Sequence, residues 1–126
     1  INNDMEGTVY DFKIGDLKFQ EKIAEINKEN KYIFSLSKRN NIQKMQYDIG
    51  DNDFYWLNCA DKKIFFVIPE KVLINKGFIG NNKKTIFIKV ALTDKLNNKK
   101  SWLEPYMFNY EKIDEEQLKT IINFSK

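Results

Sequence analysis

Three polar residues near the start of the chain carry side chains suited to the hydrolysis of a phosphate ester. Asp11, Gln20 and Lys22 supply a carboxylate, an amide and an ammonium group. Carboxylate and amide oxygens suit Mg²⁺, and a divalent cation held by them stabilises negative charge and activates water. A neighbouring lysine can orient or deprotonate that water and offset the charge that develops on the phosphate. These residue types therefore indicate a metal-dependent hydrolytic site, provided that the chain brings them together.

The surrounding segment, Gly7 to Ala24, predicts a β-hairpin that does so. Two runs rich in β-forming residues flank Gly15-Asp16, and glycine at the first position of a two-residue loop favours a type II′ turn. Pairing outward from this turn places Asp11 directly opposite Gln20. Lys22 then joins them on the same face, because side chains alternate along a strand.

The other face of the predicted hairpin is apolar. It pairs Ile14 with Leu17 and Phe12 with Phe19, and its members are Tyr10, Phe12, Ile14, Leu17, Phe19 and Ile23. Glu21 also falls on this side, where a carboxylate needs a polar partner or an edge position. The polar face has a second interpretation, because solvent-exposed hairpin faces commonly carry Asp, Gln and Lys.

The order of these residues resembles the PD-(D/E)XK nuclease superfamily. Asp11 precedes a short hairpin and then Gln20-Glu21-Lys22, which is similar to the variant with Gln-x-Lys in place of the acidic residue, known among homing endonucleases. The resemblance implies that Mg²⁺ or Mn²⁺ is held by the Asp11 carboxylate, the Gln20 side chain and the Glu21 carbonyl. It also implies that Lys22 activates the attacking water.

A second block of sequence resembles the superfamily as well, and it follows the hairpin as it does in members. Tyr47 precedes the run Gly50-Asp51-Asn52-Asp53-Phe54-Tyr55-Trp56, and a polar turn leads on to Ile64-Phe65-Phe66-Val67-Ile68-Pro69. We expect the acidic residues to shape a turn, with Asp53 near the metal or substrate, and Tyr47 to be a core aromatic. The resemblance implies an α/β fold, a restriction-endonuclease-like mixed β-sheet with flanking helices, in which residues 1–126 form a single domain.

The chain departs from the superfamily pattern upstream of the hairpin. Members usually carry a glutamate on a helix before it, whereas this chain begins at Ile1. We therefore expect either a fragment of a longer chain, with that helix upstream of Ile1, or an incomplete site. Glu6 is the nearest substitute, but strand parity puts it on the wrong face unless a bulge intervenes.

Composition narrows the chemistry further. The chain has no histidine, which excludes Ser-His-Asp and Cys-His catalysis and ordinary zinc-hydrolase ligation. The single cysteine, Cys59, excludes an internal disulfide and is expected to be a small packed residue in an intracellular protein. No apolar run approaches the length of about twenty residues needed to cross a bilayer, so no membrane partner is expected.

A polar, basic stretch from Lys38 to Lys44 is the candidate DNA contact, predicted here as a loop. Lys38, Arg39 and Lys44 can neutralise phosphates, and Asn41 can read a base edge. The net charge of +3 does not indicate a uniformly basic nucleic-acid binder, but it allows a basic stripe on one face. The stretch from Lys38 to Lys44 has a second interpretation, a solvated loop in a lysine-rich protein. The predicted function is a DNA endonuclease, a homodimer if it cuts both strands. A non-catalytic DNA-binding module and a protein-interaction domain are the alternatives.

The remaining elements follow from periodicity. Asp114 to Phe124 predicts a helix, with acidic residues in its first turn and an apolar stripe. A shorter helix is predicted to follow Pro69 and to end near Gly77. The predicted strands after the hairpin cover residues 31–37, 64–68 and 84–92, and residues 47–57 are predicted to begin with a Gly/Asp turn and to continue as a strand.

Overall fold

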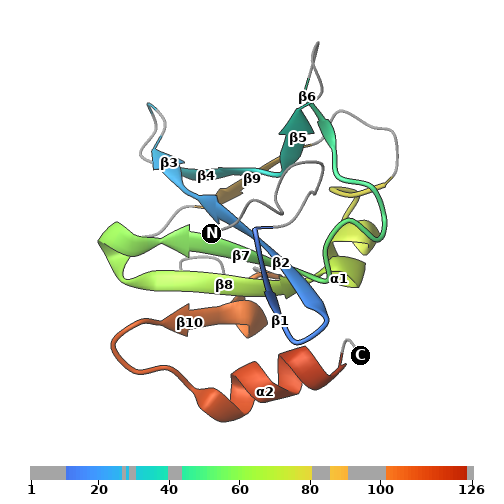
Figure 1. Ribbon diagram of the computed structural model, residues 1–126. Helices are drawn as coiled ribbons and strands as arrows, with labels where there is room; N and C mark the ends of the chain where they lie inside the picture. Colours follow the sequence, from blue (N-terminus) through green and yellow to red (C-terminus); the bar gives the residue numbers. More distant parts are fainter. Residues whose placement is uncertain are drawn as a thin grey trace.

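The computed structural model describes residues 11–26, 28, 31–39, 44–80, 86–90 and 102–124. These residues form a layered α/β arrangement in which a five-stranded sheet is covered on both faces (Figure 1). In spatial order this sheet contains β1 (Phe12–Ile14), β2 (Leu17–Ile23), β7 (Phe54–Cys59), β8 (Ile64–Pro69) and β10 (Met107–Asn109).

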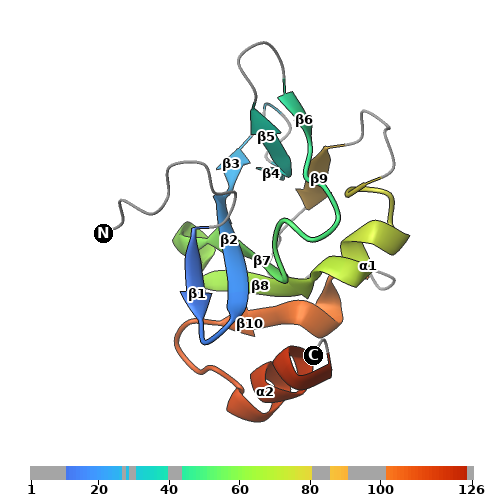
Figure 2. The ribbon, with the colours of Figure 1, turned by 45° about the vertical axis from the view of Figure 1, so that its right-hand side comes forward.

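The other elements lie to either side of this sheet. A three-stranded sheet contains β3 (Glu25–Ile26), β4 (Tyr32–Ser35) and β9 (Phe87–Val90), and a two-stranded ribbon contains β5 (Ser37–Arg39) and β6 (Lys44–Gln46). The helices are α1 (Glu70–Asn75) and α2 (Glu115–Phe124), with short 3-10 turns at η2 (Ala60–Lys62) and η3 (Glu104–Tyr106). Figure 2 shows the ribbon extending away from the five-stranded sheet, on the side opposite α2.

The first two strands form the predicted hairpin in the predicted register. Ile14 lies opposite Leu17 and Phe12 lies opposite Phe19. Gly15 has a φ of 61°, the sign that the first loop position of a type II′ turn requires and that glycine adopts without steric cost.

The five-stranded sheet is mixed because β2 and β7 run parallel whereas its other pairs are antiparallel. A parallel pair needs a crossover connection, and here that connection carries β3, β4 and the β5–β6 ribbon. The crossover thus brings the second sheet and the ribbon onto the face of the sheet that bears the side chains of Gln20 and Lys22.

Two apolar cores result, one on each face. Between the sheet and α2 the buried side chains are Phe19, Phe54, Phe65, Val67, Phe108 and Ile121. Between the sheet, α1 and the second sheet they include Tyr32, Phe34, Leu36, Tyr47, Tyr55, Leu57, Phe66, Ile68, Leu73 and Ile88. Strand alternation accounts for the division, since successive residues of β7 and β8 enter opposite cores.

The C-terminal helix confirms its prediction. The carboxylate of Asp114 accepts a hydrogen bond from the Gln117 backbone N–H at 3.1 Å, which caps the first turn. The helix packs Leu118, Ile121 and Ile122 on the sheet. The shorter helix α1 also lies where it was predicted, directly after Pro69, and Gly77 follows it with a φ of 86°.

Three predictions need correction or qualification. The stretch from Lys38 to Lys44 is not simply a loop, because both of its ends belong to strands of the antiparallel ribbon. The apolar face of the hairpin is incomplete, because Ile14 and Ile23 are 54% and 72% exposed. The strand predicted over 84–92 is seen as β9, and its flanks at 84–85 and 91–92, like Tyr10, lie outside the described residues. Within the described ranges, no helix is long and apolar enough to cross a membrane.

Candidate active site

In the hairpin, the Asp11 carboxylate accepts hydrogen bonds from two donors on β2. Asp11 extends the pairing by one residue, because its N–H donates to the Phe19 carbonyl at 2.8 Å. Its Oδ2 atom accepts hydrogen bonds from Gln20 Nε2 at 2.7 Å and from the Glu21 backbone N–H at 2.8 Å. The side chains of Asp11 and Gln20, predicted to face each other from sequence, are in direct contact.

The Gln20 amide lies between two oxygens that suit a hard cation. Its Nε2 atom is 2.7 Å from Asp11 Oδ2 and 3.5 Å from the Glu21 carbonyl oxygen, so both oxygens point to one position. The side chain is 9% exposed, which holds the amide in place. A half-turn of the amide would present its oxygen instead of its nitrogen, giving a carboxylate, an amide and a carbonyl oxygen as donors.

Lys22 lies on the same face of β2 as Gln20 but reaches into the second layer. In the parallel register Gln20 lies beside Tyr55, and Lys22 lies beside Leu57. Lys22 Nζ donates to the Ser37 carbonyl at 3.2 Å and lies 5.1 Å from the centroid of the Tyr47 ring. The predicted lysine is therefore present on the polar face, with its ammonium group at the base of the β5–β6 ribbon.

Tyr47 was predicted to be a core aromatic, and it was not counted among the site residues. It is 3% exposed and contacts the Tyr55 ring edge-on, with centroids 5.3 Å apart. Burial raises the pKa of its phenol, and the nearby Asp11 and Asp51 carboxylates raise it further. It is therefore a core aromatic, as predicted, and at the same time a neighbour of both Asp11 and Lys22. Its place ahead of the Gly-Asp block was the available signal.

The acidic residues after Tyr47 shape a turn. The N–H of Asp51 donates to the Asp48 carbonyl at 3.1 Å, and the Asp51 carboxylate accepts from the Asp48 N–H at 2.8 Å. Gly50 occupies the third position of this turn with a φ of 94°, where glycine is favoured. The predicted turn is thus present in this block.

Asp53 makes structural contacts at the start of β7, and its place near a metal or substrate stays a prediction. Its Oδ2 accepts from the Lys18 backbone N–H at 2.7 Å, and its own N–H donates to the Lys18 carbonyl at 2.8 Å. These bonds join the starts of β2 and β7. Nearby, Glu70 accepts a hydrogen bond from the Gly50 N–H. Burial raises the pKa of the Glu70 carboxyl.

Glu21 has the polar partner that its position on the apolar side requires. Its carboxylate accepts a hydrogen bond from Asn58 Nδ2 on β7 at 2.8 Å. The Glu21 side chain thus turns to the face opposite Gln20, and only its backbone takes part in the arrangement around Asp11. Cys59, at the end of β7, is 1% exposed, and burial raises the pKa of its thiol to about 12, so it is the small packed residue that was predicted.

Three of the candidate DNA-contact residues lie on the strands of the ribbon. The backbone register pairs Lys38 with Met45 and Arg39 with Lys44. Asn41 lies outside the described residues.

In the part of the chain that the structure describes, the candidate site has few carboxylates. No group of three or more His, Cys, Asp or Glu side chains there is arranged to hold a metal ion. Glu6 lies outside the described residues. Within the described ranges, the Asp11 carboxylate and the Glu21 carbonyl oxygen both lie near the Gln20 amide nitrogen.

Comparison with known proteins defines the class of fold. No protein-family model matches the chain, and no curated protein matches it. Solved structures do match, and they confirm the predicted class, a restriction-endonuclease-like mixed sheet with flanking helices.

Two solved structures share this fold. The bacterial homing endonuclease I-Ssp6803I matches with a TM-score of 0.65 and 22% identity over 99% of this chain and 80% of its own. The protein MepB matches with a TM-score of 0.64 and 18% identity over 80% of this chain and 76% of its own. At these identities the likeness shows a shared fold.

Proposed function

We propose that this chain is a metal-dependent DNA endonuclease domain of the PD-(D/E)XK type, in its Gln-x-Lys variant and of the homing or mobile-element kind. The observation that carries the proposal is the contact of the Asp11 carboxylate with Gln20 and Glu21 on the hairpin. The similarity of the fold to a homing endonuclease supports it.

In this proposal the chain holds Mg²⁺ or Mn²⁺ with three oxygens. These are the Asp11 carboxylate, the Glu21 carbonyl and the Gln20 amide oxygen. The amide nitrogen of Gln20 lies near the other two oxygens, and rotation of the amide would bring its oxygen there instead. A divalent cation bound there stabilises charge on the phosphate and promotes ionisation of water. Only one of these three ligands is negatively charged, so the divalent cation should bind weakly without a further ligand.

Lys22 has the second role. Its ammonium group lies on the same face as Gln20. Lys22 would orient the attacking water, accept a proton from that water if the lysine is present as the free amine, or offset the charge on the phosphate.

We assign DNA contact to the basic stretch that includes the ribbon strands, through Lys38, Arg39, Lys44 and Asn41. A two-stranded ribbon is narrow enough to enter a DNA groove. Cutting both strands would require a homodimer.

Supercoiled plasmid incubated with Mg²⁺ or Mn²⁺ tests the assignment. The wild-type chain should nick the plasmid, and Asp11→Ala should abolish nicking. Lys22→Ala should slow it by about 10²–10⁴-fold, the range for a proton-transfer group. Asp16→Ala, which removes a carboxylate from the turn of the same hairpin, and Lys62→Ala are matched controls that should nick like the wild type. Equal nicking by all five proteins would overturn the assigned roles.

One observation favours a second candidate, a non-catalytic DNA-binding module on the same fold. The described residues present a single carboxylate at the converging oxygens, and no acidic cluster joins it. Salt-dependent binding to a labelled duplex that survives Asp11→Ala and Lys22→Ala, without nicking by the wild type, would select this candidate. A chain with no salt-dependent DNA affinity would instead be a protein-interaction domain.

A further inference from the structure

The root of the β5–β6 ribbon is anchored in the core at several points. Leu36, directly before β5, is fully buried, and its N–H donates to the Ile86 carbonyl at 2.6 Å. Gln46, the last residue of β6, is 8% exposed, and its Nε2 donates to the Gly77 carbonyl at 3.0 Å. The ribbon therefore leaves the body of the protein from a fixed base.

Two contacts of the Lys22 ammonium are made with this base. Ser37, whose carbonyl accepts from Lys22 Nζ at 3.2 Å, is the first residue of β5. Tyr47, whose ring lies 5.1 Å from the same nitrogen, directly follows β6. Ser37 lies opposite Gln46 in the ribbon register, so the carbonyl and the ring belong to one structural unit.

We propose that this unit positions Lys22, with the Ser37 carbonyl and the Tyr47 ring holding the ammonium group on the polar face of β2. Tyr47 is then a positioning residue that acts through Lys22. A carbonyl oxygen and an aromatic face both attract an ammonium group, and together they restrict a flexible side chain with four rotatable bonds. Strand β2 supplies the lysine, and the ribbon determines where its charge lies.

The inference rests on the proposed function for its catalytic meaning, because the ribbon is also the element to which DNA contact was assigned. DNA bound at the ribbon would lie next to the unit that holds the Lys22 ammonium. The same element would then contact the DNA and fix the lysine that acts on the phosphate.

The first test reads the contact without any cleavage. In isotopically labelled protein, the ε-methylene resonances of Lys22, assigned by their loss in Lys22→Arg, should be displaced by the Tyr47 ring current. The displacement should persist in Tyr47→Phe, which keeps the ring, and vanish in Tyr47→Leu. Tyr110→Leu, which removes an aromatic ring at the other face of the sheet, should leave the Lys22 resonances unchanged. Undisplaced resonances in the wild type would overturn the inference.

The second test reads the consequence. Tyr47→Leu should lower kcat for plasmid nicking by about tenfold to a hundredfold, with KM for DNA nearly unchanged, because misplacing a catalytic group by about 1 Å has an effect of that order. Tyr47→Phe should keep kcat near that of the wild type. Equal losses in both variants would contradict a positioning role for the ring.

Two further measurements cover the other outcomes. If Tyr47→Leu does not fold, nuclear Overhauser contacts between the Lys22 ε-methylene and the ring in the wild type and in Tyr47→Phe decide the question, and their absence overturns the inference. A short duplex added in the presence of a chelator should shift the Lys22 resonances, and an unmoved Lys22 beside bound DNA would overturn the link to the ribbon. A wild-type chain that shows the ring-current displacement but nicks no DNA would refute the proposed function while leaving the contact in place.

Discussion

The two faces of the five-stranded sheet are formed by the same strands but carry different kinds of side chain. Toward α2 the strands present stacked aromatic rings, which belong to a buried apolar cluster. Phe12 stacks on Phe19, and Trp56 stacks on Phe65, with ring centroids 5.0 and 4.5 Å apart. Toward the second sheet, the same β2 strand presents Gln20 and the stem of Lys22, whose polar groups donate hydrogen bonds to Asp11 and to the Ser37 carbonyl.

The difference shows how a single alternating strand can serve stability and chemistry at once. Side chains at every second position of β2 supply apolar area that is removed from water on folding. The positions between them carry groups whose burial is tolerated because each has a hydrogen-bond partner. Substitutions on the α2 face should therefore change the free energy of unfolding, and substitutions on the other face should chiefly change activity.

The largest effect is expected for Phe65→Ala. Phe65 is fully buried and lies between Trp56, Phe108 and Tyr110, with ring centroids 4.5–5.1 Å away. Truncating a ring in such a site lowers the free energy of unfolding by about 3–5 kcal/mol. Urea denaturation measures the change. Ile14→Ala, at an exposed position of the hairpin, is the matched control and should change stability by less than about 0.5 kcal/mol.

Gln20→Met should give the opposite pattern. The substitution keeps a side chain of similar length but removes the donor to Asp11, which lowers the free energy of unfolding by about 1 kcal/mol. Under the proposed function it should abolish plasmid nicking, because an oxygen ligand is lost. A stability loss as large as that of Phe65→Ala, or unchanged nicking, would contradict the division between the two faces.

A pH series tests the polar face through Glu70. Burial raises the pKa of its carboxyl, the Gly50 N–H and Lys18 oppose the rise, and Asp53 and Asp51 add to it. A carboxyl with a raised pKa stabilises the fold fully below its ordinary pKa, and this contribution is lost as pH rises through the raised value. Relative to Glu70→Gln, the wild type should therefore lose stability with rising pH across that window in urea titrations. A difference that is constant with pH would contradict the shift.

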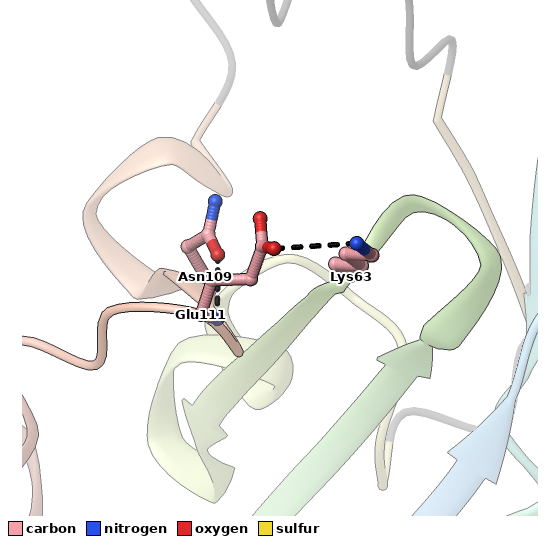
Figure 3. A network of polar contacts seen from close by, with 3 residues as sticks. All are labelled: Lys63, Asn109 and Glu111. Atoms are coloured by element: carbon pink, nitrogen blue, oxygen red, sulfur yellow. Dashed lines mark hydrogen bonds and ion pairs between the residues drawn. The ribbon is translucent and has the colours of Figure 1, made fainter.

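The smallest effects are expected at the edge of the sheet, outside both faces (Figure 3). Lys63 Nζ lies 3.2 Å from a Glu111 carboxylate oxygen, and the two side chains are 63% and 67% exposed. The Glu111 N–H also donates to Asn109 Oδ1 at 2.7 Å. Such an exposed ion pair is screened by solvent, so Glu111→Gln should change the free energy of unfolding by less than about 0.5 kcal/mol.

Lys63→Gly breaks the same ion pair and adds one change. Lys63 has a φ of 59°, a left-handed conformation that glycine adopts more easily than lysine. Relief of that strain should exceed the entropic cost of glycine and raise the free energy of unfolding by about 0.5–1 kcal/mol. Thermal or urea unfolding of the two variants side by side measures the difference, and a destabilised Lys63→Gly would show that the ion pair matters more than the backbone.

The local parts of this fold could be predicted from sequence, because they depend on neighbours in the chain. The Gly15 turn and strand alternation were enough to place Asp11 against Gln20, and Asp114 marked the start of α2. The β5–β6 ribbon was missed because its strands are short and polar, and neither periodicity nor composition distinguishes them from a loop.

The non-local parts were beyond a reading of periodicity. Strand β10 pairs with β8 from some forty residues away, and its sequence around Pro105 gave no strand signal. The position of the Lys22 ammonium depends on Ser37 and Tyr47, which only the crossover brings near. A side chain's face follows from its strand, but the partner it meets follows from topology.

The parallel pairing of β2 with β7 has a consequence for the order in which the candidate site forms. The Asp11–Gln20 contact spans nine residues, whereas the Lys18–Asp53 bond that joins the two parallel strands spans thirty-five. Closing the longer loop has the greater entropic cost, and non-local pairings of this kind slow folding. The carboxylate and amide can therefore meet early in a folding chain, while Lys22 reaches its partners only after the crossover has closed. Completion of the native topology, and not formation of the hairpin, is then the step that assembles all three groups.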